Sequence, residues 1–252
     1  MIAAIAKREL QSMFLSPLAW VTLAVIAFIM AYVFLIQVQL FTEYQPRLAG
    51  LPSAPGVTEI VAAPMFRFAV LLLTLIAPLL THRAIAGERR AGTLTLLQAA
   101  PVSPADIVLG KWLALMGFLT IVVAIVTAMP GSLTLGTSLD WRHMAACIIT
   151  LLLLLGMFTA IGIFISAVVD EPVAAAIFTF GSLLLLKIID WTAEVTTAST
   201  SSSAMHYLSM SRHVEPMLAG RFASTDVLYF VIFTALFLSL AVWRLEEDRL
   251  QR

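Results

Sequence analysis

Charged side chains that could take part in chemistry are few in this sequence, and several of them gather in two short stretches. The first stretch holds Arg83, Glu88, Arg89 and Arg90, and the second is the adjacent pair Asp170 and Glu171. Two carboxylates that are adjacent in sequence are poorly arranged for acid and base catalysis. We interpret Asp170 and Glu171 as polar residues of a solvated turn. The first stretch carries both signs of charge and suits charge-assisted hydrogen bonds in a polar cleft.

The motifs of three catalytic classes are missing. An ATPase needs a glycine-rich phosphate loop that ends in Gly-Lys-Ser/Thr, whereas Gly110-Lys111 is followed by Trp112 and lacks the upstream glycine. Neither a His-Glu-x-x-His pair for zinc nor a Gly-x-Ser-x-Gly nucleophile elbow occurs. The single cysteine, Cys147, excludes an internal disulfide and a CxxC metal site. We predict that this chain is not an enzyme and has no cofactor or metal of its own.

Composition indicates that lipid surrounds most of the molecule. The 252 residues are 61% hydrophobic and only 12% charged, and the mean hydropathy is +0.99, whereas soluble domains are roughly a quarter charged. The formal net charge is zero, so the chain lacks the basic surface that nucleic-acid binding requires. We expect an all-α membrane protein without a nucleic-acid partner.

Six stretches are long and apolar enough to cross a bilayer, which takes about 20 residues of helix. The predicted spans are Pro17 to Gln39, Ala62 to Leu80, Ile107 to Met129, Ala145 to Val168, Val173 to Ile189, and Val227 to Trp243. Only four residues separate the fourth span from the fifth, which predicts a tight helical hairpin.

The distribution of basic residues predicts that both termini are cytoplasmic, because cytoplasmic loops are enriched in Lys and Arg. Of the fifteen Lys and Arg residues, nine fall on the side that carries the termini: Lys7, Arg8, Arg83, Arg89, Arg90, Lys111, Arg244, Arg249 and Arg252. The other side has Arg47, Arg67, Arg142, Lys187, Arg212 and Arg221.

Three regions lie outside the spans. Residues 1–16 place apolar side chains on one face of a helix, although Glu9 interrupts that face, and we expect an interfacial helix. Residues 82–106 form a cytoplasmic segment with room for one short helix between two turns. Residues 190–226 form an external segment. There, His206, Met210, His213 and Met217 recur at helical spacing. Copper favours such ligands, but an amphipathic helix gives the same pattern, and we favour the helix.

Arg67 is the candidate pathway residue of the spans, because it lies about one turn inside the second span. A side chain that extends back to the membrane surface also explains an arginine at this position, and we favour this explanation.

The stretch from Pro78 to Ser103, with its continuation to Lys111, carries a specific pattern of residues. It contains Pro78-Leu-Leu-Thr-His-Arg83, Glu88-Arg89, Gly92-Thr93, Leu97, Pro101-Val-Ser103 and Gly110-Lys111. At this spacing the sequence resembles the type-two ABC transporter permeases, especially the branch linked to gliding motility and nitrous-oxide-reductase maturation. Arg8-Glu-Leu and Ser16-Pro-Leu-Ala-Trp20 resemble the same branch. The chain departs from the pattern at Gly87, Thr95 and Pro172.

This resemblance implies a permease subunit of a bacterial inner-membrane ABC transporter. Two copies of a separate ATPase subunit would bind ATP and Mg²⁺, and a second permease chain, identical or similar, would complete the assembly. Residues 82–106 would be the ATPase-coupling segment, with Arg83, Glu88, Arg89, Arg90, Gly92, Thr93 and Leu97 as its coupling residues. Asp170 and Glu171 would form a second contact. An intramembrane enzyme, an assembly factor and a membrane scaffold without an ATPase partner remain the alternatives.

Overall fold

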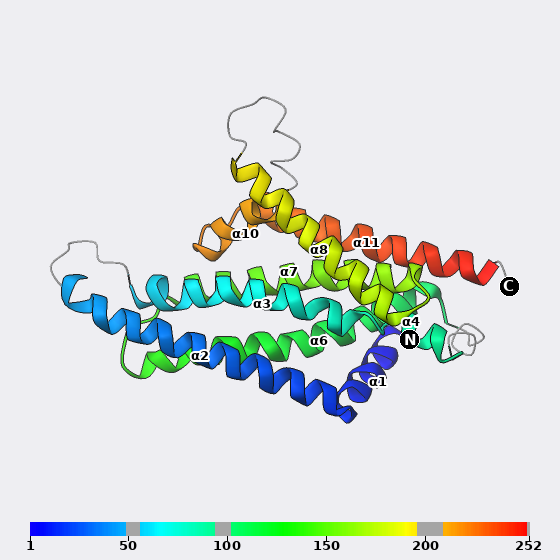
Figure 1. Ribbon diagram of the computed structural model, residues 1–252, viewed down its shortest axis with the longest axis horizontal. Helices are drawn as coiled ribbons and strands as arrows, with labels where there is room; N and C mark the ends of the chain where they lie inside the picture. The colour runs from blue at the N-terminus through cyan, green and yellow to red at the C-terminus, as the bar shows by residue number, and fades with distance from the viewer. Residues whose placement is uncertain (49–55, 94–101, 196–208, 251–252) are drawn as a thin grey trace.

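The computed structural model describes residues 1–48, 56–93, 102–195 and 209–250, and all regular structure in these residues is helical (Figure 1). Six helical segments of the described residues are long and apolar enough to cross a membrane: Pro17–Pro46, Thr58–Arg90, Pro104–Leu135, Trp141–Val168, Pro172–Ile189 and Ser224–Leu250. These segments confirm the prediction of an all-α polytopic membrane protein with six spans.

The long helices extend beyond the apolar stretches that predict them. They are α2 (Pro17–Leu48), α3 (Ala63–Thr81), α6 (Pro104–Gly131), α7 (Trp141–Val168), α8 (Pro172–Val195) and α11 (Ser224–Leu250). Hydropathy detects only the part of a helix that suits hydrocarbon, whereas polar residues can continue the helix into the interface. In α2, for example, Gln39 Nε2 donates to Glu43 Oε1 at 3.3 Å, an i,i+4 contact that supports the helix past the predicted end.

The central helix of the bundle is α7, which packs against α3, α6, α8 and α11. In the most apolar 18-residue stretch of α7, 67% of the residues are buried inside the protein. The corresponding share is 28% in α2 and 22% in both α8 and α11. Gly162 allows α7 to approach α3 closely, because a Cβ at this position would overlap the Thr81 side chain. The outer faces of α2, α8 and α11 are therefore left for lipid or for another apolar surface.

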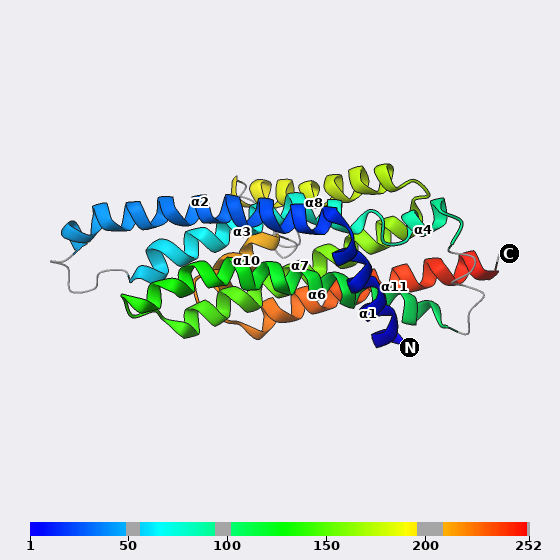
Figure 2. The same cartoon turned by 90° about the horizontal axis from the view of Figure 1, so that it is seen from below.

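Five short elements complete the fold of the described residues: α1 (Ile2–Leu15), the π-helical turn η1 (Thr58–Ala62), α4 (Ala86–Arg90), the 3₁₀ turn η2 (Ser132–Leu135) and α10 (Met210–Leu218). Both termini lie at one end of the bundle together with α4 (Figure 1). At this terminus-bearing end α1 crosses the bundle and packs on α6 and α2 (Figure 2). The opposite end carries η1 and η2. The short helix α10 lies on the side of the bundle toward that end.

Candidate functional site

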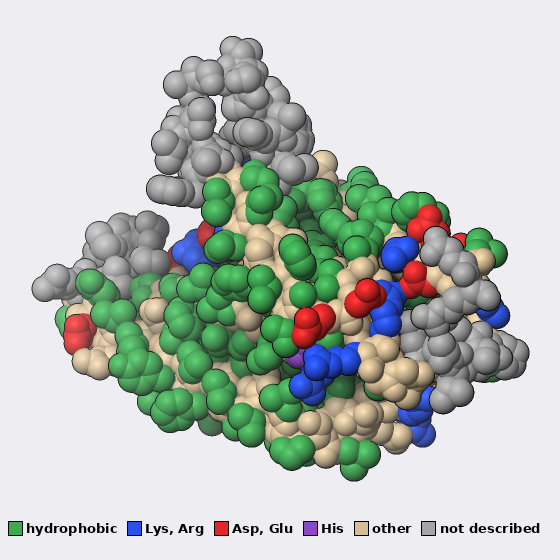
Figure 3. Space-filling model, turned by 45° about the vertical axis from the view of Figure 1, so that its right-hand side comes forward, with side chains coloured by type: hydrophobic (Ala, Val, Ile, Leu, Met, Phe, Trp, Pro, Cys, Tyr) green, Lys and Arg blue, Asp and Glu red, His purple; other side chains and the backbone are tan. Residues whose placement is uncertain are grey.

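Charged side chains gather at the terminus-bearing end, whereas the visible flank of the bundle is mostly hydrophobic (Figure 3). The short helix α4 lies among these charges and follows α3 after a turn of four residues. Its position is determined by α7, whose fully buried Ser166 hydroxyl accepts hydrogen bonds from Ile85 N and Ala86 N, both at 3.0 Å. Ser166 also donates to the His82 carbonyl at 3.1 Å. One hydroxyl thus satisfies the backbone between α3 and α4.

The end of α4 is determined by a glycine. Gly92 has φ +70°, a left-handed conformation that glycine adopts at little cost. Its N–H donates to Arg89 O at 3.1 Å, and the Thr93 N–H donates to Glu88 O at 3.0 Å. These two bonds form a Schellman motif, which terminates a helix. Gly92 and Thr93 therefore act on the local backbone, and this limits α4 to Ala86–Arg90.

Glu88 faces the bundle and pairs with a buried lysine. Lys111 Nζ of α6 donates to Glu88 Oε1 at 2.7 Å and to Glu9 Oε1 of α1 at 3.0 Å. The Lys111 side chain is only 4% exposed, and those of Glu9 and Glu88 are 23% and 18% exposed. One ammonium group thus links α1, α4 and α6, which are far apart in sequence.

Arg89 makes the corresponding contacts with the other half of the bundle. Its guanidinium donates to Asp170 Oδ1 at 2.7 Å, to Ala167 O at 3.0 Å and to the Asp248 carboxylate. These acceptors belong to the α7–α8 turn, the end of α7, and α11. The Arg89 side chain is 13% exposed, so most of its hydrogen-bonding capacity is used inside the molecule.

Arg90 and Glu171 present the outward side of the same cluster. Arg90 Nη1 lies 3.4 Å from Glu171 Oε1, and their side chains are 65% and 63% exposed. Together with Arg89 and Asp170 they line a surface hollow of about 260 Å³. The structure therefore brings the two charged stretches of the sequence into contact.

Comparison with known proteins assigns the chain to a family. The family model described as "ABC-2 family transporter protein" matches residues 3–250. This chain belongs to the ABC-2 transporter family. The match spans nearly the whole sequence and confirms the predicted resemblance to type-two ABC permeases, and it supports a membrane component of an ABC transporter. A search of the curated proteins gave no match.

In this ABC-2 transporter protein, the predicted coupling residues differ in their surroundings. Glu88 and Arg89 are paired within the molecule, whereas Arg90 is exposed. Arg83 is exposed as well and forms no ion pair with any residue in the described ranges. Leu97 lies outside the described residues.

The candidate pathway residue Arg67 lies at the opposite end of the ABC-2 protein. Its Nε donates to Glu215 Oε2 of α10 at 2.8 Å, and both side chains are about half exposed, 50% and 51%. The side chain therefore reaches out of α3 to pair with α10, which agrees with the favoured explanation of an arginine that extends to the surface.

The helix predicted in the 190–226 segment is α10, and it packs on α7, α8, α3 and α11. Its buried face includes Met210, His213 and Met217. His213 Nδ1 lies 2.7 Å from Asp226 Oδ1, and its ring stacks on Tyr229. The favoured amphipathic helix thus covers other helices of this chain. His206 lies outside the described residues, and the described part of the chain has no group of three or more His, Cys, Asp or Glu side chains that could hold a metal.

Sequence reasoning did not select Glu9, Lys111, Ser166 or Asp248 as site residues. Glu9 interrupts an apolar helix face and Lys111 lies within an apolar helix, and each feature signals a paired charge. Their partners could not be assigned, because the pairs join residues 102 and 23 positions apart.

Proposed function

We propose that this chain is the membrane-spanning subunit of an ATP-driven transporter, and that a separate ATPase subunit docks at α4 and the α7–α8 turn. The family match and the six spans support the membrane role. The lack of a phosphate-binding loop in the sequence requires that another chain binds ATP and Mg²⁺. The exposed charges around the 260 Å³ hollow are suited to contact a soluble protein.

The observation that carries this proposal is the way in which α4 is tied to the bundle. Glu88 binds it to α1 and α6 through Lys111, and Arg89 binds it to the end of α7, the α7–α8 turn and α11. A force applied to α4 would reach both halves of the bundle through charge-assisted hydrogen bonds, which are shorter and stronger than neutral ones. Such an element can convert closure of an ATPase dimer into a rigid-body movement of helices.

This division of roles refines the coupling residues expected from sequence. Glu88 and Arg89 hold α4 against the bundle, and Gly92 and Thr93 terminate it. Arg90 and Glu171 are the charges that a docked ATPase would meet, together with Asp170, whose side chain is 86% exposed. Coupling therefore needs one set of contacts between α4 and the helix bundle and a second set between the exposed charges and the ATPase.

We further propose that two copies of this chain, or this chain and a similar one, assemble with two ATPase subunits in the bacterial inner membrane. Each chain offers one α4, whereas an ATPase dimer presents two equivalent docking sites. The terminus-bearing end would be cytoplasmic. The apolar outer faces of α2, α8 and α11 provide surface for contact with the second permease by close packing.

Affinity purification of the tagged chain from native membranes tests the docking site. Wild type should co-purify an ATPase subunit that carries a Gly-Lys-Ser/Thr loop. The exchange Arg90→Glu with Glu171→Lys preserves the internal pair but reverses the charges shown to a partner. We expect this exchange to reduce ATPase recovery and ATP hydrolysis about tenfold, the effect of losing one charge-assisted contact. Arg249→Glu, a reversal at an exposed arginine of α11, is the matched control.

Unchanged ATPase recovery from the exchange variant would place the docking site elsewhere. Recovery of wild type without any ATPase subunit would support a scaffold or an enzyme instead. The mass of the intact complex provides a separate check, because one permease chain per ATPase dimer would contradict the paired assembly.

A further inference from the structure

Arg83 differs from its basic neighbours at the terminus-bearing end. Arg89, Arg90 and Lys111 each lie within ion-pair distance of a carboxylate. Arg83 forms no ion pair in the described part of the chain, although it follows α3 by only two residues. A guanidinium has five N–H donors and no acceptor, so this side chain is available to an external anion.

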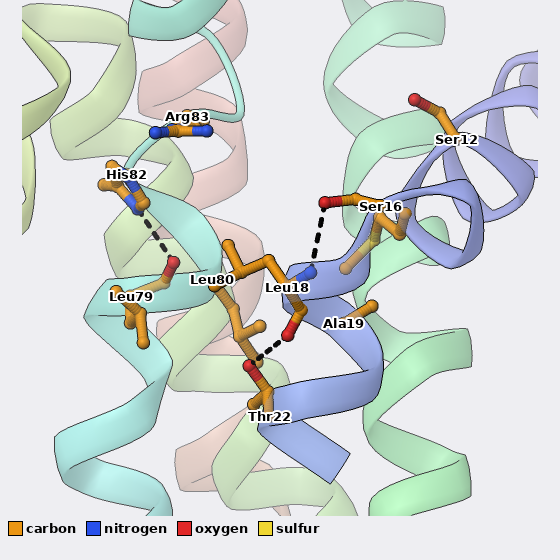
Figure 4. Close-up of a pocket in the computed structure, with 10 residues that line it drawn as sticks. Ser12, Ser16, Leu18, Ala19, Thr22, Leu79, Leu80, His82 and Arg83 are labelled. Carbon is orange, nitrogen blue, oxygen red and sulfur yellow. Dashed lines mark hydrogen bonds between the residues drawn. The ribbon is translucent and has the colours of Figure 1, made fainter. Parts of the chain in front are cut away.

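Arg83 borders a cavity of about 230 Å³ between the α1–α2 junction and the end of α3 (Figure 4). Arg83 and His82 lie on the α3 side, and Ser12 and Ser16 lie across from them on the α1–α2 side. The rest of the wall is formed by Met13, Leu18, Ala19, Leu79 and Leu80, together with Thr22, whose hydroxyl donates to Leu18 O at 2.8 Å. The cavity thus has one polar part and one apolar part.

The polar part retains free hydrogen-bonding capacity. His82 Nδ1 donates to Leu79 O at 2.8 Å, which leaves Nε2 of the neutral ring as an acceptor for a hydroxyl of the ligand. The Ser16 hydroxyl oxygen accepts a bond from Leu18 N at 3.3 Å, so its proton is available to donate. The positively charged group and the two serine hydroxyls together match the oxygens of a phosphate group.

The apolar part opens toward hydrocarbon. Leu18 and Leu79 are 44% and 48% exposed on helices that span the membrane. Trp20, close to the same junction, is 60% exposed and donates its indole N–H to Phe14 O at 2.9 Å. Exposed tryptophan is typical of the membrane–water interface. The cavity therefore lies at the depth where headgroups meet acyl chains.

We propose that this cavity binds an anionic glycerophospholipid, with the phosphodiester on Arg83 and an acyl chain along Leu18 and Leu79. Among the residues that the structure describes, no carboxylate lines the cavity. A zwitterionic headgroup would therefore bring an ammonium group that has no carboxylate to pair with in the cavity. An anionic headgroup carries no such cation, and its phosphate pairs with Arg83. Glu9 lines an adjoining cavity that Arg83 also borders, and its carboxylate is already paired with Lys111.

The bound lipid would connect α1 with the segment that leads into α4. Its phosphate would contact Arg83, three residues before α4 begins, and its glycerol oxygens would lie near Ser12 of α1. This role is independent of the proposed ATPase docking, since it concerns lipid recognition by this chain alone.

Native mass spectrometry of the purified chain tests the proposal. Phosphatidylglycerol, phosphatidylcholine and soluble glycerol phosphate are titrated separately into wild type, Arg83→Gln, Arg83→Lys and Arg249→Gln. Wild type should retain one phosphatidylglycerol about tenfold more tightly than phosphatidylcholine. Arg83→Gln should remove this selectivity, Arg83→Lys should keep part of it, and Arg249→Gln, which removes an exposed charge from α11, should keep all of it.

Equal affinity of wild type for the two lipids would overturn the proposal, and so would full selectivity in Arg83→Gln. Binding of glycerol phosphate as tight as that of phosphatidylglycerol would overturn it in favour of a soluble phosphate. The comparison of lipids on wild type needs no variant, so it can overturn the proposal even where Arg83→Gln fails to fold, and Arg83→Lys then connects the selectivity with this site.

Discussion

Among single residues, Lys111 has the most demanding environment, because it is a nearly buried ammonium inside an apolar helix. Two carboxylates face it, Glu9 at 3.0 Å and Glu88 at 2.7 Å. The second oxygen of Glu88, Oε2, is buried and has no hydrogen-bond partner in the described ranges of the chain. If one charge of a buried ion pair is removed, the opposite charge stays unpaired in a low-dielectric environment. The free energy of folding that is lost is then larger than the net contribution of the intact pair.

Lys111→Met should therefore destabilise the protein by about 3 kcal/mol, since it strands two partly buried carboxylates. Denaturant or thermal unfolding in detergent micelles measures this loss. Lys7→Met, at an exposed lysine of α1, should change stability by about 0.5 kcal/mol or less.

A neutral version of the cluster separates charge from packing. Combining Lys111→Met with Glu9→Gln and Glu88→Gln removes all three charges, so much of the lost stability should return. A triple variant as unstable as Lys111→Met alone would show that the lysine acts through its packing and not through its charge.

At the scale of elements, the close contact between α1 and α6 depends on Gly110, which has no side chain to separate the two helices. A Cβ on Gly110 would lie 2.7 Å from Ile5 Cγ2 and 2.8 Å from Ile5 Cβ. Gly110 thus lets α1 lie directly on α6, and the next residue, Lys111, can then reach Glu9. The Gly-Lys pair of the sequence has one steric role and one electrostatic role in the same contact.

Gly110→Ala should push α1 away from α6 and lower stability by about 2 kcal/mol, a typical cost of overpacking. The displacement should also increase proteolysis of α1 in micelles. Gly181→Ala is the control, because nothing lies within 4 Å of a Cβ in that position and alanine favours a helix by up to about 1 kcal/mol. Equal stability of the two variants would refute the proposed steric role.

At the scale of the whole molecule, the fold places both termini, α1 and α4 at one end, with most of the charged clusters. The enrichment of Lys and Arg at this end favours a cytoplasmic position. The opposite end presents η1, η2 and the Arg67–Glu215 pair. The proposed ATPase docking depends on this orientation, which can be tested before any partner is known.

Single cysteines in a Cys147→Ser background measure the orientation. Cys147 is buried and needs only a small replacement. Ser138→Cys, exposed between η2 and α7, should react with an impermeant thiol reagent in intact cells, whereas Ala91→Cys, exposed after α4, should react only after lysis. The reverse pattern would invert the topology and move the proposed ATPase site to the outside.

The sequence by itself determined the number and approximate position of the spans, because a bilayer requires long apolar helices whose backbone groups bond internally. It also located the segment with the family pattern and predicted a helix where α10 lies. The ends of α2, α8 and α11 were underestimated, since polar residues that continue a helix carry no hydropathy signal.

Only the tertiary structure decided which charges meet. Arg89 pairs with residues that lie 81 and 159 positions away in the sequence. Because these partners are so distant, the residues around α4 do not reveal that Glu88 and Arg89 point inward and Arg90 points outward. In a membrane this limit is physical: lipid and protein interior are equally apolar, and hydropathy therefore does not reveal which helices are neighbours. The contacts of Lys111, Ser166 and Asp248 follow from the packing of the helices around α7, and that packing depends on local shape more than on residue class.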